Sequence, residues 1–252
     1  MHLLEKIFNN RKLLKQLLKD EWDTNVINDI SLEELEIMYT SENDNNYINS
    51  GCNFTLSNLK IPSHKLHIIY YNFPELNKTG TKVNKTCCDR LNVMYKNDDY
   101  ENDDYMFERE DSLLVIINEP VSESMKKSIE TMYLKNQEIL NKQGISDNIK
   151  QEMINNKFPV KLNYFRNIHL FGINSLIINL LNHRLVPTHI PIRDDDEIKL
   201  ILDKTNCNSD QLPVIMRYDP IAKLIRLNPG NLCKIIRKSD KCGEYIYYRI
   251  CK

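Results

Sequence analysis

Apolar and polar positions alternate along this chain with two different periods, and each period predicts its own elements. At the start, apolar residues recur at helical spacing, namely Leu3, Leu4, Ile7, Leu13, Leu14, Leu17 and Leu18. Polar turn residues follow Trp22. The pattern predicts a first amphipathic helix that begins near residue 3 and ends near Trp22.

A second helix is predicted from a start signal. Ser31 precedes Glu34 by the three residues of a capping box, and apolar residues follow at Leu35, Ile37 and Met38. The helix should begin at Leu32. The polar stretch 41–51 then predicts a loop.

The middle of the chain predicts a strand, a helix and a second strand. Residues 65–73 are rich in β-formers, 81–95 have a helical pattern, and 113–118 form a continuous apolar run. A βαβ unit with a right-handed crossover is expected. Residues 96–111 repeat Asn-Asp-Asp-Tyr and lack apolar surface, which predicts a solvated, mobile insertion.

Two helices and a further strand are expected next. Residues 121–156 consist mostly of helix formers interrupted at Gly144, which predicts two helices joined by a turn. The apolar stretch 175–190 predicts a strand that ends through Val186-Pro187. That exit is the expected domain boundary.

The C-terminal part has the densest set of local signals. Residues 194–204 predict a helix with acidic residues in its first turn, and Asp219-Pro220 predicts the N-cap of a brief helix over 221–227. Two β-rich runs, 232–239 and 244–251, then predict a terminal hairpin. Period-two alternation places Ile246, Tyr248 and Ile250 on one face, and Tyr245, Tyr247 and Arg249 on the other.

Composition favours a folded, soluble protein. The chain has 252 residues, of which 41% are apolar and 27% are charged. No stretch approaches eighteen uncharged apolar residues, so a membrane span is not expected. Seven cysteines, including the adjacent Cys87 and Cys88, make a poor disulfide framework and indicate reduced thiols.

The formal net charge of −1 conceals an asymmetry. From His183 onward there are 13 Lys/Arg against 9 Asp/Glu, and before it 21 against 26. Nucleic-acid contact by the first part would therefore need a local basic patch.

Candidate chemistry is sparse. Six glycines and the lack of a phosphate-loop motif argue against nucleotide hydrolysis, and the spacing of Cys233, Cys242 and Cys251 is not that of a zinc site. His183 and His189 have no nucleophile at a motif spacing. We therefore predict no catalytic, cofactor-binding or metal-binding residue. A magnesium-dependent nuclease would commonly use Asp/Glu-x-Lys after a strand, but the match, Glu197-Ile198-Lys199, lies in a predicted helix.

Several motifs occur in order over the last seventy residues. They are Leu185-Val186-Pro187 with His189, Gln211-Leu212-Pro213, Asp219-Pro220, Gly230, Lys234-Ile235-Ile236-Arg237, Gly243 and Tyr248-Arg249. With these motifs the chain closely resembles the shared fifth subunit of eukaryotic nuclear RNA polymerases. The archaeal counterpart of that subunit is similar to this C-terminal part alone. The first helices and residues 67–82 resemble the family more loosely.

The resemblance implies an α/β (α+β) fold of two domains. Residues 1–181 would form an N-terminal jaw domain, with a mixed sheet, flanking helices and the insertion at about 96–111. Residues 182–252 would form a small C-terminal assembly domain that ends in a β-hairpin. It also implies a non-catalytic subunit without cofactors, which docks on the largest polymerase subunit and the rest of the core, and lies near downstream double-stranded DNA. The interface candidates are Leu185, Val186, Pro187, His189, Gln211, Leu212, Pro213, Asp219, Pro220, Gly230, Arg237, Tyr248 and Arg249.

The sequence departs from the family pattern at two places, and alternatives remain open for the source and the function of the protein. Arg226 stands where a glycine is usual, and a Thr-Pro-Ser-Ala-like turn is replaced by Pro120-Val-Ser-Glu-Ser. The Asn/Ile/Lys-rich composition favours a large DNA virus as the source, which would imply the virion and a cytoplasmic viral factory rather than the nucleus of a cellular version. The alternative functions are a jaw-like nuclease and a free-standing regulator that binds a host polymerase.

Overall fold

The computed structural model describes residues 2–40, 50–73, 95, 106–239, 241 and 243–252. The chain forms two compact units. Unit 1 comprises Met1–Glu152 and Phe165–Ile178, and unit 2 comprises Met153–Tyr164 and Asn179–Lys252. Residues 153–164 thus group with unit 2, whereas the sequence-based division assigns them to the first domain; the division at 181/182 remains a proposal.

Unit 1 is built on a four-stranded mixed sheet with the order β1-β2-β3-β4. Strand β1 pairs with β2 antiparallel, and β2, β3 and β4 pair parallel. The strands are β1 (Phe54–Ser57), β2 (Lys65–Tyr71), β3 (Ser112–Ile117) and β4 (Ile168–Gly172).

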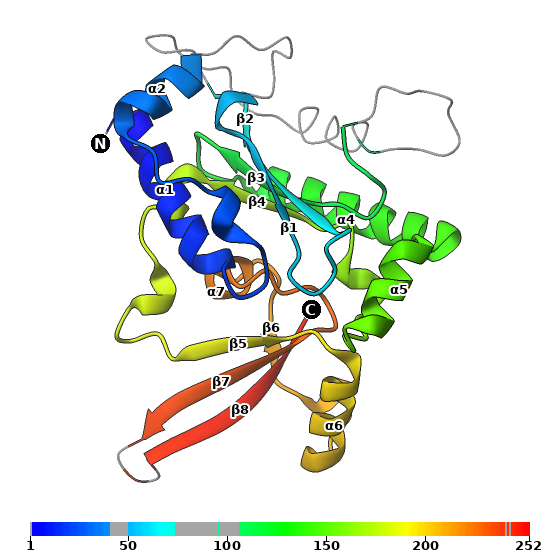
Figure 1. Cartoon of the computed structure of the whole chain (residues 1–252). Coiled ribbons are helices and arrows are strands. Elements are labelled where there is room, and N and C mark those ends of the chain that lie inside the picture. Colours follow the sequence, from blue (N-terminus) through cyan, green and yellow to red (C-terminus); the bar gives the residue numbers. More distant parts are fainter. Residues whose placement is uncertain (1, 41–49, 74–94, 96–105, 240, 242) are drawn as a thin grey trace. The chain divides into compact units, whose positions relative to one another are not determined.

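Helices lie on both faces of this sheet (Figure 1). On one face, Met125, Ile129 and Met132 of α4 pack in a core with Val115 and Leu170. On the other face, the hydroxyl of Tyr70 donates to Asn10 Oδ1 of α1 at 3.0 Å. The helices of unit 1 are α1 (Leu3–Leu18), α2 (Leu32–Thr40), α4 (Glu123–Gln143) and α5 (Asp147–Asn155), whose last residues belong to unit 2, and the 3-10 turns are η1 (Thr24–Val26), η2 (Ser50–Cys52) and η4 (Ile173–Leu176).

Unit 2 has a second four-stranded sheet with the order β5-β7-β8-β6. Strand β7 lies antiparallel between β5 and β8, and β6 pairs with β8 parallel. The strands are β5 (Thr188–Ile192), β6 (Val214–Ile215), β7 (Leu232–Ser239) and β8 (Gly243–Cys251), the helices are α6 (Asp195–Thr205) and α7 (Pro220–Leu224), and the 3-10 turns are η3 (Leu162–Tyr164), η5 (Leu180–Asn182) and η6 (Ser209–Gln211).

This architecture confirms the α+β fold class and most predicted elements. The capping box forms, since Glu34 N donates to Ser31 Oγ at 3.1 Å and Ser31 N donates to Glu34 Oε2 at 2.7 Å. The parallel pairing of β2 with β3 confirms the two strands of the βαβ unit. Its predicted helix lies almost entirely outside the described residues.

Two expectations are wrong. The apolar stretch 175–190 forms mainly 3-10 turns and only the start of β5, because Asn179 caps a turn by accepting from Leu181 N at 3.0 Å. The end of the insertion is not solvated either. Phe107 is buried in the core under α4, and Asp111 is buried before β3. Residues 96–105 lie outside the described part.

No helix in the described ranges is long and apolar enough to cross a membrane.

Candidate subunit interface

The terminal hairpin forms as predicted, with a continuous ladder from Leu232↔Ile250 to Ser239↔Gly243. Gly243 begins β8 with φ +71°, a left-handed conformation that glycine adopts without steric cost. Strand β5 accompanies β7 only as far as Thr188↔Ile236. The last residues of β7 and the first of β8 therefore pair only with each other, and the hairpin extends beyond β5 (Figure 1).

One face of this sheet is covered only at the end away from the hairpin turn, which we call the inner end. Ile192, Leu232 and Ile250 share a row of the ladder and pack against Ile198 and Ile201 of α6. Further along the same face, α6 covers the side chains less completely. Ile190 is 40% exposed and Ile246 is 50% exposed. We call Ile190, Ile236, Ile246 and Tyr248 the apolar patch; Ile236 and Tyr248 are half-buried, and Tyr248 also packs against the α6 core.

The opposite face is also covered only at its inner end. Cys233, Ile235 and Cys251 pack there against Ala222 and Leu227. Burial raises the pKa of the Cys233 thiol to about 11 and that of Cys251 to about 12. Both thiols are therefore protonated at neutral pH, which disfavours metal binding and nucleophilic chemistry.

Beyond this core, the same face carries arginines and tyrosines in contact with one another. The guanidinium of Arg237 lies 4.8 Å from the Tyr247 ring centroid, and that of Arg249 lies 5.9 Å from it. Tyr245 and Tyr247 stack with their centroids 5.8 Å apart. We call these four residues the arginine–tyrosine cluster. They alternate with the apolar patch, as the period-two pattern predicts.

The other interface candidates are more dispersed. Leu185, 75% exposed, and the half-buried Val186 and Pro187 precede β5. His189 lies on the cluster's face, opposite Ile235, and its Nδ1 donates to the Pro187 carbonyl at 2.7 Å. Burial lowers the His189 pKa, so the ring is neutral at pH 7.

Four further candidates make contacts that stabilise unit 2 itself. Gln211 Oε1 accepts from Asn208 N at 2.7 Å, and Asp219 Oδ1 caps α7 by accepting from Ile221 N at 2.8 Å. The Pro213 carbonyl accepts from Ile250 N at 2.9 Å. Gly230 has φ +90°, which explains the need for glycine there. Of the rest, Pro220 occupies the first turn of α7, and Leu212 packs beside the α6 core.

Sequence reasoning omitted Ile190, Ile236, Ile246, Tyr245 and Tyr247 from the interface candidates. The alternation of the hairpin assigns each residue to a face. It does not show where the covering helices end, so the exposed positions could not be selected.

Comparison with known proteins identifies the family. A family model described as RNA polymerase Rpb5, C-terminal domain, matches residues 178–251. The DNA-directed RNA polymerase subunit Rpo5 of Methanococcoides burtonii is 45% identical over 71 residues, which are 28% of this chain and 90% of that protein. The chain belongs to the Rpb5 family of RNA polymerase subunits.

Two other relatives of the Rpb5 family agree with this assignment. The Rpo5 subunit of Methanothermobacter thermautotrophicus is 41% identical over 71 residues, covering 28% of this chain and 91% of that protein. The DNA-directed RNA polymerases I, II, and III subunit rpabc1 of Dictyostelium discoideum is 37% identical over 81 residues, covering 32% of this chain and 41% of that protein. The matches thus concern about the last third of the chain.

The structure accounts for one departure from the Rpb5 family pattern. Arg226 has φ +51° and lies just after α7. This left-handed conformation is the one that glycine adopts most readily, so a glycine is the expected residue at such a turn. The backbone conformation is therefore compatible with both residues.

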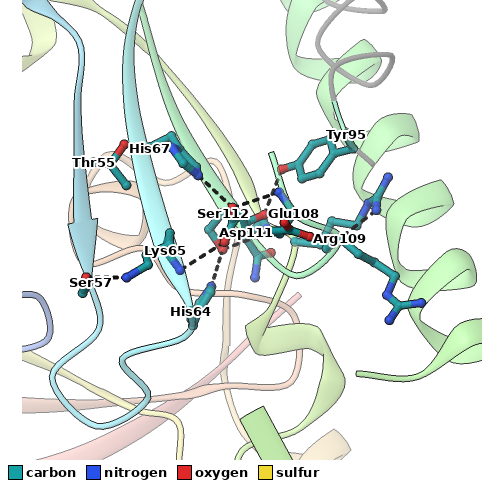
Figure 2. A network of polar contacts seen from close by, with 12 residues as sticks. Thr55, Ser57, His64, Lys65, His67, Tyr95, Glu108, Arg109, Asp111 and Ser112 are labelled. Carbon is teal, nitrogen blue, oxygen red and sulfur yellow. Dashed lines mark hydrogen bonds and ion pairs between the residues drawn. The ribbon is translucent and has the colours of Figure 1, made fainter. Parts of the chain in front are cut away.

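A second set of polar residues in this Rpb5-family chain lies in unit 1 (Figure 2). The Thr55 hydroxyl lies 2.9 Å from His67 Nδ1, and His67 Nε2 lies 2.8 Å from Asp111 Oδ2. A hydroxyl, an imidazole and a carboxylate in series are also the groups of a nucleophilic triad. Here, however, Thr55 and His67 are direct partners in the β1–β2 ladder. Asp111 also accepts from the backbone N–H groups of Lys65 and Glu108. We interpret these residues as a structural hydrogen-bond network that links neighbouring strands.

The nuclease motif does not form a metal site. Glu197 and Lys199 lie in α6, as predicted, and Lys199 pairs with Asp195 at 2.9 Å. Within the described ranges, no group of three His, Cys, Asp or Glu residues could hold a metal ion.

Proposed function

We propose that this chain is a non-catalytic subunit of a multisubunit DNA-directed RNA polymerase, attached to the enzyme through the hairpin of unit 2. Membership of the Rpb5 family supports the polymerase assignment. The relatives named Rpo5 correspond almost entirely to the matched region, so that region is sufficient for a subunit of this kind.

The apolar patch is the observation that supports attachment through the hairpin. The two exposed isoleucines lie on one face of the sheet, Ile190 on β5 and Ile246 on β8, with the half-buried Ile236 of β7 on the strand between them. Such a surface is unusual for a protein face that remains in water, because contiguous apolar patches mark interaction sites. Ile190 and Ile246 are too far apart in sequence to form a patch without the β5-β7-β8 order. We propose that the largest polymerase subunit covers this patch.

Unit 1 would then form a jaw near the downstream DNA duplex. Support for this part comes from the looser resemblance of the N-terminal helices and the first strands to the family. Contacts would be made to the phosphate backbone and not to base edges. The location of the protein would follow that of its polymerase, the nucleus for a cellular enzyme and the virion or a cytoplasmic factory for a viral one.

Affinity purification from cells that make the tagged full-length chain tests the proposal. Two very large polymerase subunits should co-purify with the wild type, and the Ile246→Asp variant should lose about tenfold or more of them, because a carboxylate would be buried at the interface. Ile37→Asp is the matched control, since Ile37 is an exposed isoleucine of α2 in unit 1.

Recovery of the wild type without polymerase subunits would contradict the proposal. Co-purification of a complete polymerase that already contains its own Rpb5-family subunit would instead favour the free-standing regulator. Magnesium-dependent cutting of DNA by the purified chain would favour the nuclease.

A further inference from the structure

The net positive charge of residues 183–252 lies in the terminal hairpin. Between Leu232 and Lys252 the sequence carries six Lys/Arg against two Asp/Glu, a net charge of +4. From His183 to Asn231 the seven basic and seven acidic residues cancel. The hairpin therefore accounts for the whole positive charge of the C-terminal part.

Most basic side chains of the hairpin lack acidic partners within the described part of the chain. Lys252 lies 3.5 Å from Asp210, but no described carboxylate pairs with Arg237, Arg249 or the three other lysines. Surface arginines of folded proteins usually lie beside a carboxylate or extend into water. Here Arg237 and Arg249 instead lie over the ring of Tyr247, and Arg249 Nη1 also donates to the Val214 carbonyl at 3.2 Å.

This arrangement prepares the guanidinium groups for a carboxylate. An arginine held against an aromatic ring has already lost part of its side-chain freedom, so less entropy is lost when it binds. In Arg237 the flat face of the group lies over the ring, which leaves its N–H edge for a partner. That edge matches a carboxylate in a bidentate pair.

The same geometry disfavours a nucleic acid. Bases bind to aromatic side chains by stacking on open ring faces. In the cluster, Tyr245 and Tyr247 stack on each other with an interplanar angle of 24°, and arginine lies over Tyr247. The faces that bases would need are thus partly occupied.

We infer that the arginine–tyrosine cluster binds an acidic segment of the polymerase subunit on which the hairpin docks. The inference rests on the proposed function and deepens it. The apolar patch and the cluster lie on opposite faces of the same two strands, so the partner would contact the projecting hairpin from both sides. The apolar face would supply most of the buried area, and the arginines would fix the position of the partner's carboxylates.

Photo-crosslinking within the assembled enzyme tests this directly. Tyr245→benzoylphenylalanine in the tagged full-length chain should, on irradiation, cross-link to a polymerase subunit. The cross-linked peptide, read by mass spectrometry, should contain more acidic than basic residues. A cross-link to nucleic acid or to a neutral or basic segment, or the absence of a cross-link, overturns the inference.

Substitution of Arg237 provides the second test, because its described contact is only with Tyr247. Arg237→Gln should reduce the recovery of the large subunits about tenfold. Arg237→Lys should have an intermediate effect, because lysine keeps the charge but lacks the planar pair of N–H donors that binds a carboxylate at two points. Lys204→Gln is the matched control, since it removes the same charge from an exposed residue of α6, outside the hairpin. Urea unfolding should show the same midpoint for all three variants.

Equal losses for Arg237→Gln and Lys204→Gln would overturn the inference while leaving the polymerase assignment intact. Failure of the wild type to recover large subunits would instead remove the proposed function, and the inference with it.

Discussion

The imidazole Nε2 of His67 lies 2.8 Å from Oδ2 of Asp111, joining β2 to the residue that precedes β3. A carboxylate can only accept here, so Nε2 carries the proton, and Nδ1 faces the hydroxyl of Thr55 on β1. The buried Asp111 therefore connects an antiparallel edge strand, a parallel strand and the chain that enters β3 (Figure 2).

Removal of this carboxylate should destabilise unit 1. In Asp111→Ala, His67 Nε2 and the N–H groups of Lys65 and Glu108 all lose their acceptor. We expect the free energy of unfolding to fall by about 2–4 kcal/mol, measured by urea denaturation. Asp29→Ala is the control, because Asp29 forms an exposed ion pair with Lys15 and should change stability by less than about 0.5 kcal/mol. Equal effects of both variants would contradict the assigned role.

A close backbone approach should make Gly172 intolerant of a side chain. A Cβ at this position, at the end of β4, would lie 2.6 Å from the Glu119 carbonyl oxygen. Gly172→Ala should destabilise unit 1 by about 1–3 kcal/mol through this overlap.

Gly144→Ala separates steric overlap from backbone strain. Nothing lies within 4 Å of a Cβ at Gly144, but its φ is +72°. We expect a cost of about 1–3 kcal/mol from the backbone conformation alone, because φ +72° with ψ −170° is a combination that almost only glycine adopts. Thermal denaturation of both variants measures the two losses of stability. An unchanged stability of Gly172→Ala would show that the backbone at Glu119 moves away without cost.

The stability of unit 2 should depend on pH through His189. Burial lowers its folded-state pKa below the ordinary value of 6.5, so the unfolded chain binds the proton more readily. Stability should be constant above about pH 7.5 and decline as the pH falls through 6.5 toward the folded pKa. His189→Gln should flatten this part of the urea-unfolding profile. An unchanged slope between pH 7.5 and about 5.5 would exclude His189 as its source.

Thiol accessibility should distinguish the cysteines of the described part. Cys52, Cys233 and Cys251 are buried, and burial raises their pKa values to about 11, 11 and 12. Cys207 is partly exposed. Brief alkylation with iodoacetamide at pH 8, mapped by mass spectrometry, should modify Cys207 in the native protein and the other three only after unfolding. Modification of Cys233 in native protein would contradict the packing beneath α7.

Prediction from the sequence succeeded where the signal was local. The Ser31 and Glu34 capping box, the Asp219-Pro220 cap and the alternation in β8 all depend on residues close in the chain. It failed for β1 and β4, because short strands with mixed sequences are defined by their partners in the sheet. The apolar stretch 175–190 shows the converse error, since a short apolar run does not distinguish a strand from turns that pack against a core.

Residue patterns alone established that this chain has amphipathic helices, a terminal hairpin with two different faces, and the ordered motifs of the Rpb5 family. The assembled fold was needed to show which parts of those faces stay uncovered. Both α6 and α7 end over the inner rows of the sheet, and β5 stops at Thr188↔Ile236. Coverage depends on segments distant in the chain, and the periodicity of one strand contains no information about them.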